Sequence, residues 1–150
     1  MLLGEILIQK KLITQVQLEE ALEIQRETKE FLGVILVSRR FIREPDLLKA
    51  LSDQFQIPVI NLKDYYIDWD AAMKFSSTVV CEYRCLPVRA DAKSITVAIT
   101  NPLDAIAISK VEEEAREFKV NLILVSNADM DEALKTYNRH MSQKIRKMLE

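Results

Sequence analysis

Apolar residues recur at helical spacing in two early segments of the chain, and these segments repeat one another. Residues 3–25 and 32–54, aligned at a period of 29, share nine identical positions out of 23. Each has a short apolar stretch followed by a stripe such as the one from Leu18 to Gln25, which places its side chains on one helix face. Each segment is therefore predicted to be a helical hairpin, and two hairpins can form a four-helix lobe.

Polar residues mark where the longer helices of these hairpins begin. Thr14 is placed as an N-cap, and Gln17 stands at the capping-box position three residues later. In the second repeat Pro45 suits the first turn of a helix, where its missing N–H does no harm. Asp46 beside it complements the positive end of the helix dipole.

After Gln56 the pattern changes to short apolar runs separated by turns. Residues 94–100 alternate as a strand does, and a helix is predicted between them and a strand at 120–125. That order favours a parallel β-α-β unit with a right-handed crossover. The other predicted elements are an edge strand or extended segment at 57–62, a helix from Asp68 or Asp70 toward Arg84 broken near Ser76-Ser77, a strand at 85–90, a turn at 91–93, a helix over 103–118, and a last helix from 126–129 through Tyr137 into a charged tail.

The predicted fold class is therefore α+β, with an α/β-like second part. Residues 1–56 form the helical lobe and residues 57–150 form a small mixed lobe with a C-terminal helix. The closing Leu149-Glu150 is also compatible with a piece of a longer protein.

Charge and hydropathy exclude some classes of function. The net charge of −2, with the charges well mixed, argues against a dedicated nucleic-acid binder. No segment reaches the roughly 18 apolar residues of a membrane span. Glu5 interrupts the first apolar stretch and no basic leader precedes it, so we expect no signal peptide. We expect a cytoplasmic protein without direct membrane insertion.

Catalytic and metal chemistry have little support in the sequence. Cys81 and Cys85 lie four residues apart, but zinc takes four ligands and the single histidine, His140, is distant. We interpret both cysteines as small, partly buried side chains in a reducing compartment. Two glycines cannot form a P-loop, and no nucleophile–base pair is apparent. We predict no enzyme activity, no catalytic residue and no metal ligand.

Some paired features leave alternatives open. Gly4 and Gly33 occupy equivalent positions, which indicates a special backbone angle or a close approach. Gln25 and Gln54 either bind a ligand or tie down a backbone group of the neighbouring hairpin. Trp69, with Tyr65 and Tyr66 in the linker before the second lobe, covers an interlobe seam or a partner site. Five cations form an anion site or complement the C-terminal ends of the first and third helices: Lys10, Lys11, Arg39, Arg40 and Arg43.

The tandem Leu-Gly starts and closing glutamines resemble the N-terminal domain of bacterial type II secretion and type IV pilus assembly ATPases, the MshEN-like or GspE N-terminal family. The resemblance covers residues 2 to about 138. Its second half is carried by Cys85-Leu86-Pro87-Val88, by the run from Ile95 to Asp104, by Leu122-Ile123-Leu124-Val125 and by Thr136-Tyr137.

The resemblance implies a binding surface, because some members of that family bind cyclic di-GMP through the tandem motif. A glycine at a helix start lets a base or phosphate approach backbone N–H groups, and an amide can pair with a guanine edge. The implied ligand-binding positions, with the two cations that replace motif glycines, are Leu3, Gly4, Leu7, Lys11, Leu18, Leu22, Gln25, Leu32, Gly33, Leu36, Arg40, Leu47, Leu51 and Gln54.

This chain departs from the binding motif at four positions. The motif has arginine before each Leu-Gly, where this chain has Leu2 and Phe31. It has glycine after each short helix, where this chain has Lys11 and Arg40. An arginine supplies a fixed charge and a fork of donors that Leu and Phe do not replace.

Three functional hypotheses follow. The first is a non-catalytic regulatory and docking domain that contacts the inner-membrane platform protein of a secretion or pilus system. The resemblance implies that such a domain is peripheral at the inner membrane only through this partner. The second is a cyclic di-GMP receptor with a degenerate motif; no other cofactor is expected. The third is a stand-alone signalling adaptor that has neither ligand nor motor.

Overall fold

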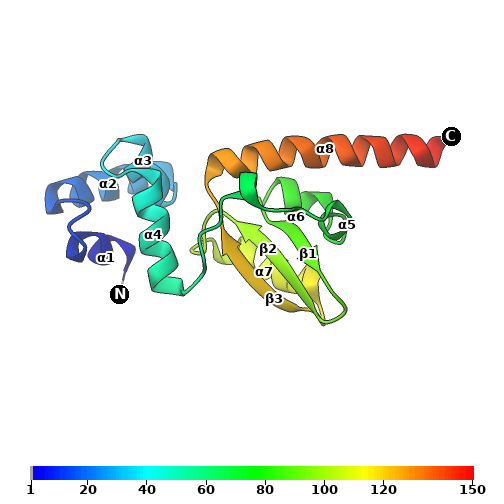
Figure 1. Ribbon diagram of the computed structural model, residues 1–150. Coiled ribbons are helices and arrows are strands. Elements are labelled where there is room, and N and C mark those ends of the chain that lie inside the picture. Colours follow the sequence, from blue (N-terminus) through cyan, green and yellow to red (C-terminus); the bar gives the residue numbers. More distant parts are fainter. Residues whose placement is uncertain (1) are drawn as a thin grey trace. The chain divides into compact units, whose positions relative to one another are not determined.

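Two compact units make up the chain in the computed structural model, which describes residues 2–150 (Figure 1). Residues 1–54 form the helical unit and residues 55–150 form the α/β unit. The sequence placed this boundary two residues later, after residue 56.

The helical unit consists of two consecutive helical hairpins, as the repeats predicted. Its core is apolar and takes equivalent residues from each repeat, including Leu7 and Leu36, which are fully buried. The capping box at Thr14 is formed: its hydroxyl accepts from the N–H of Gln17 at 3.1 Å, and the Gln17 amide oxygen accepts from the N–H of Thr14 at 2.9 Å. The helices are α1 (Leu3–Gln9), α2 (Gln15–Thr28), α3 (Leu32–Ser38) and α4 (Glu44–Phe55), with Pro45 in the first turn of α4.

The α/β unit is built around a three-stranded sheet of order β1-β2-β3. Strands β2 and β3 are parallel and are joined through α7, so the predicted β-α-β unit is confirmed. Strand β1 pairs antiparallel with β2, with an irregularity between Pro87 and Arg89. The elements are η1 (Leu62–Asp64), α5 (Trp69–Ala72), α6 (Ser77–Cys81), β1 (Leu86–Ala90), β2 (Ser94–Ile99), α7 (Ala105–Ala115), β3 (Lys119–Leu124) and α8 (Asn127–Leu149).

The segment at 57–62 forms only a β-bridge, between Val59 and Leu124, rather than the edge strand that was one of its two predicted forms. The N–H of Ile60 donates to the carbonyl of Leu124 at 2.9 Å, and the N–H of Leu124 donates to the carbonyl of Pro58 at 2.8 Å. Proline has no N–H to extend the ladder. The segment is therefore extended chain beside β3.

Helix α8 closes the α/β unit and then continues past it. Met130, Ala133 and Tyr137 are buried, and the carboxylate of Asp129 accepts the N–H of Leu62 at 3.0 Å, which ties α8 to η1. The helix runs on through the charged tail to Leu149, and its last turns extend beyond the other elements of the unit (Figure 1). No helix of residues 2–150 is long and apolar enough to cross a membrane.

Candidate binding surface of the tandem repeats

The two glycines serve a close approach between helices. Gly4 and Gly33 are the second residues of α1 and α3, and neither has a positive φ. A Cβ atom built on Gly4 would lie 2.6 Å from Cδ1 of Leu18, and one on Gly33 would lie 3.0 Å from Cδ2 of Leu47. Both repeats therefore use one device, in which a leucine of the long helix sits on the glycine of the short helix.

Each short helix ends in a left-handed turn, and in the first repeat this turn is centred on Lys11. Its φ is 61°, and its N–H donates to the carbonyl of Ile8 at 2.9 Å. The N–H of Leu12 donates to the carbonyl of Leu7, also at 2.9 Å. These two bonds form a Schellman motif, whose left-handed residue is usually glycine.

The second repeat has the same turn with Arg40 at its centre. The φ of Arg40 is also 61°, and its N–H donates to the carbonyl of Val37 at 3.0 Å. The N–H of Phe41 donates to the carbonyl of Leu36 at 2.9 Å. The chain therefore has a left-handed residue, a conformation that glycine usually supplies, at both positions where the binding motif has glycine and this chain has a cation.

The candidate ligand-binding residues differ in how far a ligand could reach them. Those that form the core of the helical unit are Gly4, Leu7, Leu18, Leu36, Leu47 and Leu51. Those that are partly accessible are Leu3, Leu22, Gln25, Leu32 and Gly33. The exposed ones are Lys11, Arg40 and Gln54. Direct contact with a ligand is therefore open to the second and third groups, while the first group shapes the surface beneath them.

The two glutamines are not equivalent in their contacts. The amide nitrogen of Gln25 donates to the carbonyl of Glu30 at 3.1 Å, which ties α2 to the connection between the hairpins. Gln54 is exposed, and its amide makes no hydrogen bond with residues 2–150. Gln25 thus ties a backbone group of the connection rather than of the neighbouring hairpin, and no backbone tie is found for Gln54 within residues 2–150.

Four of the five clustered cations follow the short helices, as expected. Lys10 and Arg39 are the C-cap residues of α1 and α3, and Lys11 and Arg40 come next. Arg43 corrects the expectation, because it precedes α4 and its Nε lies 3.3 Å from the carboxylate of Asp46.

Beside Lys10 lies a hollow of about 250 Å³ with mixed charge. The Nζ of Lys10 is 3.3 Å from a carboxylate oxygen of Asp53. The hollow is lined by Lys10, Leu12, Asp46, Lys49, Ala50 and Asp53. Two carboxylates in this lining offset its cations, so the hollow is a poor site for an anion alone.

Apolar side chains face solvent at the positions of the missing arginines. Leu2 and Phe31 are the N-cap residues of α1 and α3, and they are 74% and 43% exposed. An exposed apolar residue at the same place in both repeats is a feature of contact surfaces more than of phosphate sites.

The aromatic residues that the sequence assigned to a linker belong to the α/β unit. Trp69 begins α5, and its ring stacks on His140 of α8 with centroids 4.9 Å apart. The guanidinium of Arg89 lies over the ring of Tyr65 at 5.3 Å, whereas Tyr66 is exposed. Trp69 and Tyr65 are thus used in packing within this unit.

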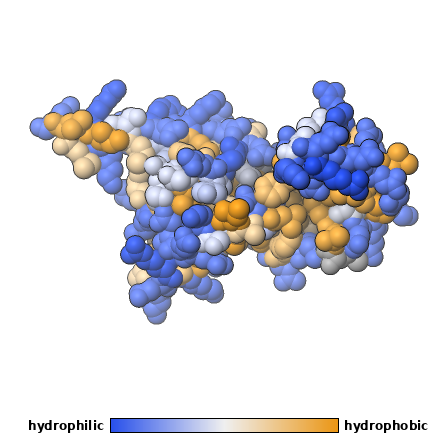
Figure 2. All heavy atoms as spheres, turned by 180° about the vertical axis from the view of Figure 1, so that it is seen from behind, coloured by the Kyte–Doolittle hydropathy of each residue, from blue (hydrophilic) through white to orange (hydrophobic). Residues whose placement is uncertain are grey.

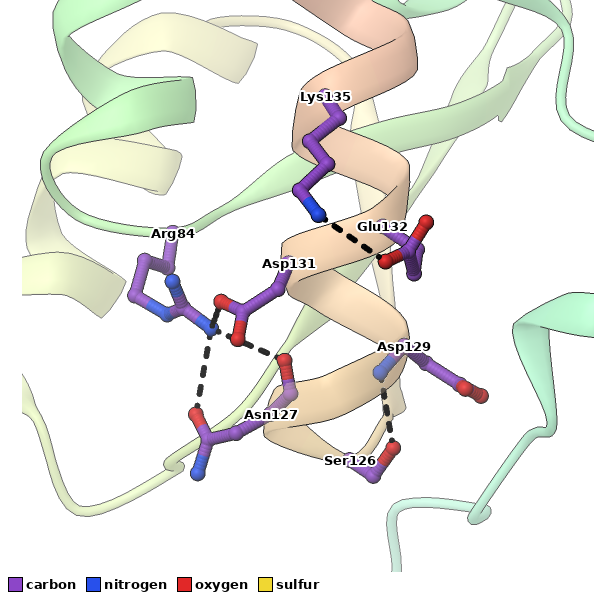
Figure 3. Close-up of polar contacts among 7 residues, drawn as sticks. All are labelled: Arg84, Ser126, Asn127, Asp129, Asp131, Glu132 and Lys135. Atoms are coloured by element: carbon purple, nitrogen blue, oxygen red, sulfur yellow. Dashed lines mark hydrogen bonds and ion pairs between the residues drawn. The ribbon is translucent and has the colours of Figure 1, made fainter.

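The start of α8 carries a polar cluster that sequence reasoning missed (Figure 3). The guanidinium of Arg84 lies 2.8 Å from a carboxylate oxygen of Asp131 and 3.3 Å from both the carbonyl and the side-chain oxygen of Asn127. These contacts join the end of the α6 region to α8. Because 47 residues separate Arg84 from Asp131, local spacing held no signal for the pair.

The cysteines are unsuited to nucleophilic chemistry. Burial raises the pKa of the Cys85 thiol to about 12, and Asp104 adds to the rise. Burial, and then Glu82, also raise the pKa of Cys81. Both thiols are therefore protonated near neutral pH, and thiolate is the reactive form. Within residues 2–150 no group of three or more potential metal ligands is found.

The α/β unit identifies the family. The model of the MshEN domain matches residues 55–144, more than half of the chain, and the chain belongs to the MshEN domain family. It is 29% identical over 135 residues to the type IV pilus assembly ATPase PilB of Myxococcus xanthus, a match covering 90% of this chain and 24% of that protein. It is 28% identical to the PilB of Thermus thermophilus, covering 74% of this chain and 13% of that protein. The chain thus spans a quarter or less of these relatives.

Solved structures with a similar fold cover nearly the whole of this chain. A structure described as MshE with cdg has a TM-score of 0.83 and 25% identity, covering 91% of this chain and 99% of that one. The N-terminal domain of XpsE has a TM-score of 0.70 at 16% identity, covering 89% and 91%, which shows the shared fold. The chain is thus an MshEN-family domain similar to part of two pilus assembly ATPases, and the expected family resemblance is confirmed.

Proposed function

We propose that this chain is a non-catalytic, cytoplasmic docking and regulatory domain of a bacterial pilus or secretion ATPase, and that it contacts the inner-membrane platform protein. Membership of the MshEN family and similarity to a quarter or less of two PilB ATPases support the proposal. A domain that binds a partner and leaves the chemistry to another part of a motor needs no catalytic residues of its own.

The observation that carries this proposal is the exposure of Leu2 and Phe31 at equivalent helix starts. Removing apolar surface of this kind from water favours association by about 25 cal/mol per Å² before the entropic costs of binding are subtracted. Aromatic side chains such as Phe31 are enriched in the cores of protein interfaces. Arginine at these two positions would favour an anionic ligand instead.

The test is to restore the motif arginines with the double substitution Leu2→Arg and Phe31→Arg. Affinity for the cytoplasmic part of the platform protein is expected to fall about tenfold or more, because two apolar contacts are replaced by charges. Val16→Arg is the matched control, since Val16 is an exposed apolar residue of the same unit outside the N-cap pair. Equal losses in the control and the double variant would contradict docking through Leu2 and Phe31.

Cyclic di-GMP is a second candidate ligand for the same unit. The specific support is the likeness to MshE with cdg, which we take to be cyclic di-GMP, together with the left-handed turns kept at Lys11 and Arg40. The accessible candidates Gln25 and Gln54 would pair with guanine edges, and the buried leucines would support the surface from below.

Calorimetric titration with cyclic di-GMP tests this candidate, with ATP and GTP as controls. Binding should weaken on Gln25→Ala or Gln54→Ala and should strengthen in the double arginine variant. Ligand at 100 times its dissociation constant would add about 2.7 kcal/mol to stability. No heat and no thermal shift, even in the double arginine variant, would remove the ligand hypothesis and leave docking. The double arginine variant is therefore expected to weaken binding to the platform protein and to strengthen binding to cyclic di-GMP.

A further inference from the structure

The apolar face of α8 does not stop where the body of the α/β unit stops. Tyr137 is buried, Met141 is half-buried, and Ile145 and Met148 are 53% and 77% exposed. Successive spacings of four, four and three residues place these side chains on one helix face. The end of α8 therefore carries an apolar stripe without a cover in residues 2–150, and hydrophobic atoms are visible at that end (Figure 2).

Positive charge is concentrated around this stripe. Residues 139–150, which we name the basic end of α8, hold Arg139, Lys144, Arg146 and Lys147 against one acidic residue, whereas the whole chain has a net charge of −2. At about 100° per residue, Lys144 borders the stripe and Lys147 lies further round on the same side, whereas Arg139 and Arg146 lie on the opposite face of the helix. No carboxylate of residues 2–150 forms an ion pair with Lys144, Arg146 or Lys147.

We propose that the basic end of α8 binds the surface of an anionic lipid bilayer. The apolar stripe would enter the boundary between headgroups and acyl chains, and Lys144 and Lys147 would contact lipid phosphates. This is the arrangement of interfacial amphipathic helices. Long cationic side chains can keep their charge at the headgroups while their methylene groups cover apolar surface. The helix would lie on the bilayer rather than span it, in line with its composition.

Charge favours this occupant over a second copy of the chain. Two basic ends packed along their stripes would bring like charges together and repel. A bilayer with anionic lipids instead attracts nearby basic residues, at about 1 kcal/mol each. The inference goes beyond the proposed docking function. Docking places the chain at the membrane through a platform protein, whereas the basic end of α8 would contact the lipid directly.

The test is co-sedimentation of the full chain with vesicles of phosphatidylcholine alone or mixed with phosphatidylglycerol. Binding is expected to be about tenfold stronger to the anionic vesicles and to fall as salt rises from about 0.05 to 0.5 M. Ile145→Glu or Met148→Glu should reduce it about tenfold. Gln143→Glu is the matched control, because it adds the same charge at an exposed position on the opposite side of the helix. Far-UV circular dichroism should show equal helix content in all variants.

Three outcomes would overturn the proposal. One is no sedimentation with anionic vesicles at low salt. Another is an equal loss in Gln143→Glu and Ile145→Glu, which would mean charge attraction without the stripe. The third is concentration-dependent self-association without vesicle binding, abolished by Ile145→Glu, which would assign the stripe to a second copy. The Leu2→Arg and Phe31→Arg variant should bind vesicles normally, so failure of the docking function and failure of this proposal are distinguishable.

Discussion

At the residue scale, the chain places cations where glycine is usual. In residues 2–150 every positive φ belongs to a residue other than glycine, and each of these residues follows a helix. They are Lys11, Lys29, Arg40, Gln56, Arg84 and Arg116. A left-handed conformation costs such residues roughly 1–2 kcal/mol. A cation beside the last carbonyls of a helix offsets part of this cost through the helix dipole.

Replacing the cations in the two Schellman turns should therefore raise stability. Lys11→Gly and Arg40→Gly are each expected to add about 0.5–1 kcal/mol to the free energy of unfolding in urea, because glycine removes the strain but gives the unfolded chain more freedom. Lys49→Gly is the control, since exposed Lys49 lies inside α4 and should lose about 1 kcal/mol. Losses at all three positions would contradict the strain at Lys11 and Arg40.

Substitution of alanine at Gly4 and at Gly33, which lie against Leu18 and Leu47, should lower stability by different amounts. Gly4→Ala is expected to cost about 1–3 kcal/mol, because its Cβ would lie 2.6 Å from buried Leu18. Gly33→Ala should cost less, since its nearest contact is 3.0 Å and alanine improves helix propensity. Thermal unfolding of both variants provides the measurement. A larger loss at Gly33 than at Gly4 would be inconsistent with these contacts.

At this scale the sequence predicted the special role of the two glycines but not the left-handed turns. Two glycines at equivalent positions predicted a backbone angle or a close approach, and only the structure shows that Leu18 and Leu47 supply the close approach. The left-handed turns at Lys11 and Arg40 gave no signal of their own, because residue propensity disfavours that conformation at a Lys or an Arg.

At the element scale, helix starts were predicted at Thr14, near Asp68 and near Ser126, whereas Ser76 was predicted only as a break and the helix after Asp104 was predicted to begin at residue 103. The hydroxyls of Thr14, Ser76 and Ser126 and the carboxylates of Asp68 and Asp104 each accept an N–H of the first turn. Strand pairing was harder to predict from the sequence, because the segment around Val59 pairs with Leu124 of β3, which is more than 60 residues away along the chain. The last helix was predicted to run through Tyr137 into the charged tail, and the structure extends it to Leu149.

The capping box of α2 gives a prediction at this scale. Thr14→Ala should reduce the free energy of unfolding by about 1 kcal/mol, because the N–H of Gln17 loses its acceptor. Thr28→Ala is the control at the other end of the same helix. Its hydroxyl donates to the carbonyl of Ile24 and accepts the N–H of Glu30 at 3.3 Å in an exposed setting, and the loss should be within about 0.5 kcal/mol. Equal effects of the two substitutions in urea unfolding would show that the cap does not stabilise α2.

At the scale of the whole molecule, the family assignment and the candidate surface rest on different units. The MshEN match spans residues 55–144, whereas the candidate surface and its four departures lie within residues 2–54. The apolar repeats predicted the helical unit, because apolar residues at helical spacing form a face that packs into a core. They could not separate leucines that form the core from residues that face a ligand, since both lie on the same stripe.

The division into units predicts that residues 55–150 fold alone. Cys85 is a probe of this, because it is buried in that unit and its pKa is about 12. In the whole chain and in the isolated fragment, iodoacetamide at pH 8 should modify half-buried Cys81 first and Cys85 only above the urea midpoint. Residues 1–54 alone should be much less stable, since a unit of about 60 residues buries only about 60% of its surface. Fast labelling of Cys85 in the isolated fragment, at the rate of the unfolded chain, would mean that the α/β unit needs the helical unit in order to fold.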